Sequence, residues 1–109
     1  MRMIRPYRDE DGRLRAGADA AMAALGDFLE TEVGENPAAF DDLWRGLDQV
    51  RRRLVTHWEF HGTLYRLRMR PDGVRIRNAQ DARGPSADLP LSTFEAVLDE
   101  WRRAWLPPS

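Results

Sequence analysis

The sequence predicts a two-layer α+β domain, in which three helices cover one face of an antiparallel β-sheet and the elements follow the order ββααβββα. Residues 56–78 alternate apolar and polar side chains with a period of two, which is typical of strands with one buried face. Residues 17–33, 36–54 and 92–105 repeat apolar side chains every three or four positions, as amphipathic helices do. A chain of 109 residues can bury one core but not two, so we expect residues 1–109 to form a single domain.

The N-terminal part predicts two short strands followed by a helix. Residues 3–8 and the segment around 13–15 are the strands, and the turn at 9–12 ends in Gly12. Pro6 restricts the first strand to an edge or an end, because proline has no amide hydrogen to donate. Residues 17–33 then form the first helix, whose apolar stripe should lie on the sheet.

The second helix has the clearest start signal. Asn36 is a suitable N-cap, and Pro37 occupies the first helical position, where its missing N–H does no harm. Its apolar stripe consists of Phe40, Leu43, Leu47, Val50 and Leu54. Since the link after Gly34 is short, we expect the first two helices to form an antiparallel pair.

Three antiparallel strands follow within residues 56–78. Gly62 separates the first strand from the second, and the Pro71-Asp72-Gly73 turn separates the second from the third. The face predicted to lie under the helices carries Trp58, Phe60, Tyr65, Leu67, Met69, Val74 and Ile76. The face predicted to meet solvent carries His57, Glu59, His61, Arg66, Arg68, Arg70, Arg75 and Arg77.

The C-terminal part predicts a loop and a final helix. Residues 79–89 are rich in Gly, Pro, Ser and Asp and have no periodicity, which favours a surface loop. Ser92 and Glu95 form a capping-box pattern at the start of the last helix, and Pro107-Pro108 should end it.

The composition is that of an ordinary globular protein. Cysteine is absent, which excludes disulfides and thiolate metal sites and fits a reducing compartment. No apolar run reaches the roughly 20 residues that a membrane helix needs, and the first residues lack the apolar core of a secretory signal. We therefore expect a cytoplasmic protein without a membrane partner.

Opposite charges are separated along the chain, although the formal net charge is only −1. Residues 17–49 contain eight acids and one arginine, whereas residues 50–83 contain nine arginines and three acids. All 17 basic residues are arginine. The pattern predicts acidic helices beside a basic sheet, which can serve either as internal complementarity or as two separate binding faces.

The sequence presents no strong catalytic or metal-binding motif. His57, Glu59 and His61 share one side of a strand, but same-face residues are about 6.6 Å apart, so the two histidines are about 13 Å apart. Such a spacing favours a polar solvent face over a zinc site. No nucleophile elbow, phosphate-binding loop or dinucleotide fingerprint is present. We therefore expect no catalytic residues, no metal and no cofactor.

The arginines of the sheet have two interpretations. As a polar surface they need no ligand, and as a phosphate-binding surface they can hold nucleic acid through Arg66, Arg68, Arg75 and Arg77. Sheet-type RNA readers usually expose aromatic side chains for stacking, whereas the aromatics here are on the buried face. This favours the solvated face over a sequence-reading site.

Several segments resemble known families. YRDEDG, FLETEVGEN, WEFHGTLYRL, VRIRNA and LSTFEAVLDEWRRAW are together similar, in order and spacing, to the YacL-like family of small uncharacterised bacterial proteins. That family supplies no catalytic residues. The size, the acidic helices and the terminal LPLSTFEAVLDEW helix are also similar in style to immunity proteins of bacterial toxin systems. A weaker resemblance, carried by residues 62–68 (GTLYRLR), is to RelE/ParE toxins and implies an RNA endonuclease.

We expect a non-catalytic inhibitor, of the immunity or antitoxin type, that occludes the active site of a cognate nuclease or deaminase toxin in a one-to-one complex. The predicted partner-binding residues are Asp27, Glu30, Glu32, Glu35, Asp41, Asp42 and Trp44. The alternative is a RelE/ParE-like RNA endonuclease or an RNA-binding protein that uses the arginines of the sheet. A homodimer through an exposed sheet edge is a third possibility.

Overall fold

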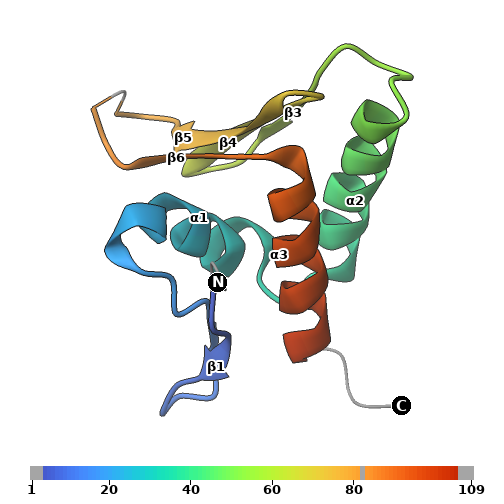
Figure 1. Cartoon of the computed structure of the whole chain (residues 1–109). Helices are drawn as coiled ribbons and strands as arrows, with labels where there is room; N and C mark the ends of the chain where they lie inside the picture. Colours follow the sequence, from blue (N-terminus) through green and yellow to red (C-terminus); the bar gives the residue numbers. More distant parts are fainter. Residues whose placement is uncertain (1–3, 82, 106–109) are drawn as a thin grey trace.

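Four consecutive strands form an antiparallel sheet in the order β3-β4-β5-β6, and three helices lie on one side of it (Figure 1). The computed structural model describes residues 4–81 and 83–105. The strands are β1 Tyr7–Arg8, β2 Leu14–Arg15, β3 Trp58–His61, β4 Tyr65–Arg70, β5 Gly73–Asn78 and β6 Ser86–Leu89. The helical elements are η1 Ala20–Met22, α1 Ala23–Phe28, η2 Leu29–Val33, α2 Pro37–Arg51 and α3 Leu91–Trp105. The predicted α+β class, with helices on one face of the sheet, is confirmed.

The fourth strand of the sheet was not predicted from the sequence. β6 pairs antiparallel with β5 inside the segment expected to be a loop, and its Ala87 and Leu89 are buried. A four-residue strand bounded by Pro85 and Pro90 contains too few alternating positions to be recognised from its pattern. Only the pairing with β5 makes it a strand.

The two N-terminal strands form a separate hairpin. β1 pairs with β2 and with no strand of the main sheet. In Figure 1 this hairpin lies at the end of the molecule opposite to the four-stranded sheet.

The first helical segment is irregular. It begins with a 3₁₀ turn (η1), continues as α1 and ends in a π-helical turn (η2), in which the Gly34 amide donates to the Leu29 carbonyl at 2.7 Å. Such a turn adds one residue to the helical repeat, so Phe28, Leu29 and Val33 are all buried. The predicted apolar stripe is thus confirmed.

Helix α2 begins as predicted and ends earlier. The Asn36 side chain accepts from the amides of Ala38 and Ala39 at 3.0 and 3.4 Å. The helix ends at Arg51 because Arg53 adopts a positive φ of 59°, and Leu54, predicted to continue the stripe, is 69% exposed. The predicted antiparallel pair of the first two helices is wrong, because the helix that packs along α2 is α3 and not α1 (Figure 1).

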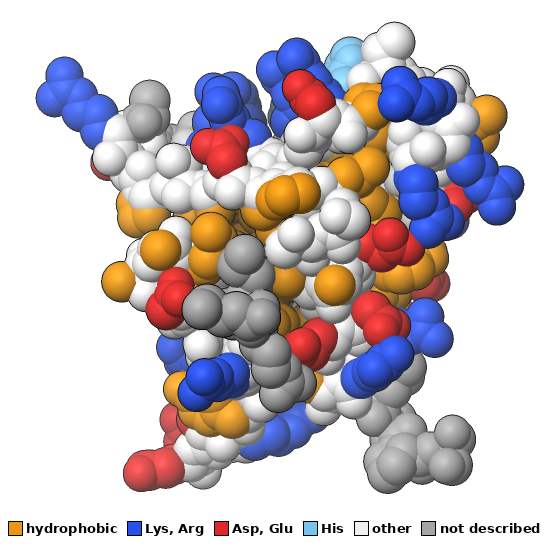
Figure 2. Space-filling model, in the orientation of Figure 1, with side chains coloured by type: hydrophobic (Ala, Val, Ile, Leu, Met, Phe, Trp, Pro, Cys, Tyr) orange, Lys and Arg blue, Asp and Glu red, His pale blue; other side chains and the backbone are white. Residues whose placement is uncertain are grey.

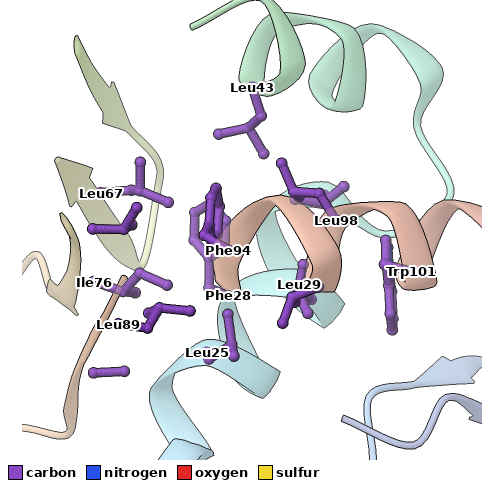
Figure 3. Packing of buried hydrophobic residues seen from close by; sticks show 14 of the residues in the cluster. Leu25, Phe28, Leu29, Leu43, Leu67, Ile76, Leu89, Phe94, Leu98 and Trp101 are labelled. Atoms are coloured by element: carbon purple, nitrogen blue, oxygen red, sulfur yellow. The ribbon is translucent and has the colours of Figure 1, made fainter. Parts of the chain in front are cut away.

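Helix α3 contributes the centre of the core. Phe94, Leu98 and Trp101 are fully buried and face side chains of the sheet, α1 and α2 (Figure 3). The helix begins at Leu91, so Ser92 is inside the first turn and the predicted capping box is wrong; Glu95 instead accepts from Arg51 at 2.6 Å. Pro107-Pro108, predicted to end this helix, lie outside the described residues.

One hydrophobic cluster joins the two layers. α1 packs under β5 and β6, α2 packs under β3 and β4, and α3 packs under β5. The Trp101 indole N–H donates to the Gly34 carbonyl at 2.8 Å, which ties α3 to the link before α2. Among the described residues, no helix therefore covers the outer face of the sheet.

Candidate anion-binding face

The outer face of the sheet presents arginines in pairs on the two central strands. Strand pairing places Arg66 opposite Arg77 and Arg68 opposite Arg75. Cβ atoms of directly opposite residues are about 4.5–5.5 Å apart, and like charges carried by such residues destabilise the sheet. Two adjacent arginine pairs therefore concentrate positive charge at the middle of the sheet.

The row containing Arg68 and Arg75 is neutralised at both ends. Glu59 on β3 lies opposite Arg68 and accepts from its Nε and Nη2 at 3.0 and 2.9 Å. Asp88 on β6 lies opposite Arg75 and accepts from its Nε at 2.8 Å. Across the four strands this row reads acid, arginine, arginine, acid.

These ion pairs also shift the pKa values of Glu59 and Arg75. The hydrogen bond from Arg68, followed by the contact with His61, lowers the pKa of Glu59 below its ordinary value. The hydrogen bond to Asp88 raises the pKa of Arg75. These shifts favour the charged forms of Glu59 and Arg75.

The neighbouring row has no such neutralisation. It reads His61, Arg66, Arg77 and Ser86 across the four strands. Within the part of the chain that the structure describes, neither Arg66 nor Arg77 has a carboxylate partner. The His61 ring leans toward Glu59 in the other row, with 3.5 Å between Nε2 and Oε2.

A shallow groove of about 600 Å³ runs over both rows. It is lined by side chains of β3, β4, β5 and β6, with Arg70 and Asp72 at the end nearest the β4–β5 turn. Figure 2 shows basic side chains gathered over the outer side of the sheet, with acidic side chains between them. The groove offers the guanidinium donors of its arginines to an anion.

The four predicted nucleic-acid-binding residues are thus brought together, but in two chemically different rows. Arg66 and Arg77 are open, whereas Arg68 and Arg75 are engaged. Asp88 and Ser86 are not among the predicted site residues, because the sequence predicts a loop where β6 forms. The four-residue alternation Ser86-Ala87-Asp88-Leu89 is the local signal of this strand, and it is too short to distinguish a strand from a loop.

The predicted acidic surface is largely occupied by contacts within the chain. The Glu32 carboxylate accepts from the backbone amides of Thr63, Leu64 and Tyr65 at 3.2, 3.3 and 3.0 Å. A Cβ at Gly62 would overlap this carboxylate, so the glycine allows the close approach. Glu32 therefore holds the turn between β3 and β4 against η2.

Three more of these acids have internal partners. Asp27 accepts from the Tyr65 hydroxyl at 2.7 Å, and burial together with this bond raises the pKa of Tyr65 to about 12. Glu30 accepts from the Ala16 amide at 2.8 Å. Glu35 forms a two-point ion pair with Arg8, at 2.6 and 3.0 Å.

The remaining predicted partner-binding residues lie on α2. Asp41 and Asp42 are exposed, and Asp42 is 3.8 Å from Arg45. Trp44 is partly buried and stacks on Phe40, with ring centroids 5.7 Å apart. These three residues, and not the acids of α1 and η2, are the part of the predicted surface that remains available.

A metal site is not assembled from the described residues. No group of three His, Asp or Glu side chains placed to hold an ion occurs within residues 4–81 and 83–105. Over the same residues, no helix has the combined length and apolar character needed to cross a membrane.

A model of the Uncharacterised protein family UPF0231 matches residues 6–100. The chain belongs to this family. The match covers both sheets, α1, α2 and most of α3, and it confirms the predicted membership of an uncharacterised family, although not the YacL-like name. Neither the curated proteins nor the solved structures contain a match to this UPF0231 chain.

Proposed function

We propose that this UPF0231 protein is a non-catalytic binding protein that holds the phosphate backbone of a nucleic acid on the outer face of its sheet. The observation that carries the proposal is the groove over the facing Arg66 and Arg77, whose guanidinium groups have no carboxylate partner among the described residues. Arginine presents a planar set of N–H donors that matches phosphate oxygens.

A nucleic acid fits this face better than an acidic protein surface does. Tight protein interfaces usually depend on aromatic or large apolar anchors. The exposed large apolar side chains among the described residues are Tyr7, Leu54 and Leu64, and none of them is on the outward side of the four strands. Charge and hydrogen bonding are what this face offers.

The absence of stacking groups on the face has a further consequence. Single-stranded nucleic acids are usually gripped through aromatic side chains as well as charge. The aromatics of these strands, Trp58, Phe60 and Tyr65, belong to the inward face. Binding is therefore expected to be independent of base sequence and strongly dependent on salt.

The test is fluorescence anisotropy of a labelled single-stranded RNA titrated with the full chain at 50–200 mM salt. Two phosphate contacts, one from each of Arg66 and Arg77, predict a slope of log K against log salt near −1.4, or a loss of affinity of roughly sevenfold over that range. Arg13→Gln is the matched control for substitutions of Arg66 and Arg77, because Arg13 is exposed in the hairpin at the other end of the molecule. No salt-dependent binding by the wild type would refute the proposal.

The same titration addresses the endonuclease alternative. RNA recovered intact on a denaturing gel after incubation agrees with a binding protein. Cleavage that is lost on Arg68→Ala would instead favour a RelE/ParE-like RNA endonuclease.

Inhibition of a toxin is a second proposal, with the YacL-like and immunity-protein resemblances as its background. The observation in its favour is that Asp41 and Asp42 are exposed on α2 beside the partly buried Trp44. A one-to-one complex with a toxin that is weakened by charge reversal at both aspartates would support it. Unchanged binding would mean that the acidic face is not the interface.

Sedimentation of the free protein tests the remaining homodimer proposal, for which β3 and β6 supply the sheet edges.

A further inference from the structure

We infer that the groove contains a two-arginine phosphate subsite, formed by Arg66 and Arg77, and that Arg68 and Arg75 beside it do not contact the ligand. This inference rests on the proposed function and divides the arginines of the face into two classes. The class of each arginine follows from its neighbours on the outer strands.

Charge repulsion makes each pair of arginines unfavourable by itself. Two guanidinium groups on directly opposite residues repel each other, so each pair favours a counter-ion. For Arg68 and Arg75 the chain supplies the counter-ions, Glu59 and Asp88, at 2.8–3.0 Å. For Arg66 and Arg77 the corresponding positions are His61 and Ser86.

A phosphate group can supply the counter-ion that Arg66 and Arg77 lack. Arg66 and Arg77 are adjacent across β4 and β5, so a single tetrahedral phosphate group can accept from both guanidinium groups. Ser86 adds a hydroxyl at one end of the row, and His61 stands at the other. A phosphate there supplies the charge that Glu59 and Asp88 supply in the next row.

Glu59 and Asp88 already occupy the guanidinium groups of the neighbouring row. A phosphate that approached Arg68 or Arg75 would have to displace a carboxylate that is already hydrogen-bonded in place. It would also meet that carboxylate as a like charge. Glu59 and Asp88 therefore direct the ligand toward the Arg66–Arg77 row.

The experiment compares charge deletions with deletions of whole ion pairs, using both labelled single-stranded RNA and inorganic polyphosphate as probes. Arg66→Gln and Arg77→Gln remove a charge from the open row. Arg68→Gln/Glu59→Gln and Arg75→Gln/Asp88→Asn each remove an arginine together with its carboxylate, so the net charge of the face is unchanged. A thermal melt of each variant checks that it is folded.

The expected result is that Arg66→Gln and Arg77→Gln each weaken binding several-fold and make the salt slope less steep by about 0.7. The ion-pair deletions should leave affinity and slope close to those of the wild type. Glu59→Gln alone should bind more tightly, because it frees Arg68 from its counter-ion.

The opposite results separate this inference from the proposed function. RNA binding in which an ion-pair deletion costs as much as Arg66→Gln would overturn the subsite and leave the proposed function standing. Binding of polyphosphate but not RNA, with the row contrast intact, would support the subsite and refute the nucleic-acid function. Absence of binding to either probe would refute both.

Discussion

The acidic residues of the helical layer and the arginines of the sheet form two charged regions of opposite sign, and the fold treats them differently. Asp27, Glu30, Glu32 and Glu35 each accept hydrogen bonds from another part of the chain. On the sheet, Arg68 and Arg75 have carboxylate partners, and the described residues supply none for Arg66 and Arg77. The excess of acids on the helices is therefore mainly structural, while the excess of arginine on the sheet includes charge that is available to a ligand.

The reason for the difference is geometrical. The acids of α1, η2 and the link after η2 lie between the helical layer, the N-terminal hairpin and the β3–β4 turn, where backbone amides and an arginine approach them. No helix or strand of residues 4–81 and 83–105 lies over the outer face of the sheet. Its only possible counter-ions within the sheet are on the edge strands, and those strands supply carboxylates to one row only.

The largest expected effect is on stability, at the Glu32 carboxylate. Glu32→Ala removes the acceptor of three backbone amides, one of which belongs to the buried Tyr65, and should lower the free energy of unfolding by about 2–3 kcal/mol. Asp41→Ala is the control, because Asp41 is exposed on α2, and it should change stability by less than about 0.5 kcal/mol. Urea denaturation followed by tryptophan fluorescence measures both. Equal effects of the two substitutions would show that the helical acids are not structural.

The next effect is a pH dependence at Tyr65. Its pKa is raised from 10.0 to about 12, so the unfolded chain releases the phenol proton at a pH where the folded chain keeps it. The stability from this group is complete below pH 10 and is lost as the pH rises to about 12, by an amount on the order of 2–3 kcal/mol.

Tyr65→Phe isolates that contribution. The variant lacks the hydrogen bond to Asp27, and it also lacks the titrating group. Unfolding free energies measured at pH 8 and at pH 11.5 should therefore converge for the two proteins at the higher pH. A constant gap between them would mean that the Tyr65 proton is not held by burial and Asp27.

The smallest effect concerns repulsion between the unpaired arginines. Arg66→Gln removes a like-charge cross-strand contact with Arg77 and should leave stability unchanged or raise it by about 0.2–1 kcal/mol at low salt. Arg68→Gln should not stabilise the protein, because it leaves Glu59 without its main partner. Thermal melts at 20 mM and 500 mM salt test this, since the gain should vanish when the charges are screened. Stabilisation by both substitutions would mean that the two rows are equivalent.

Much of the architecture could be predicted from local patterns. The alternation of residues 56–78 placed every large apolar side chain of β3, β4 and β5 on the correct face, because adjacent strand residues must point to opposite sides. Asn36-Pro37 marked the start of α2, because a helix start needs an acceptor for its free amides. The arginines of the candidate site were found in the same way, by the period of the strands.

The pattern did not reveal which charges are free. Asp88 meets Arg75 only because β6, too short to be recognised, pairs with β5 in one register. Glu32 meets the β3–β4 turn across 31 residues of chain, and Gly62 matters there for the space that its missing side chain leaves. Side-chain period is a local property of the backbone and can be read along the chain, whereas the neutralisation of a charge depends on which distant segment is folded against it.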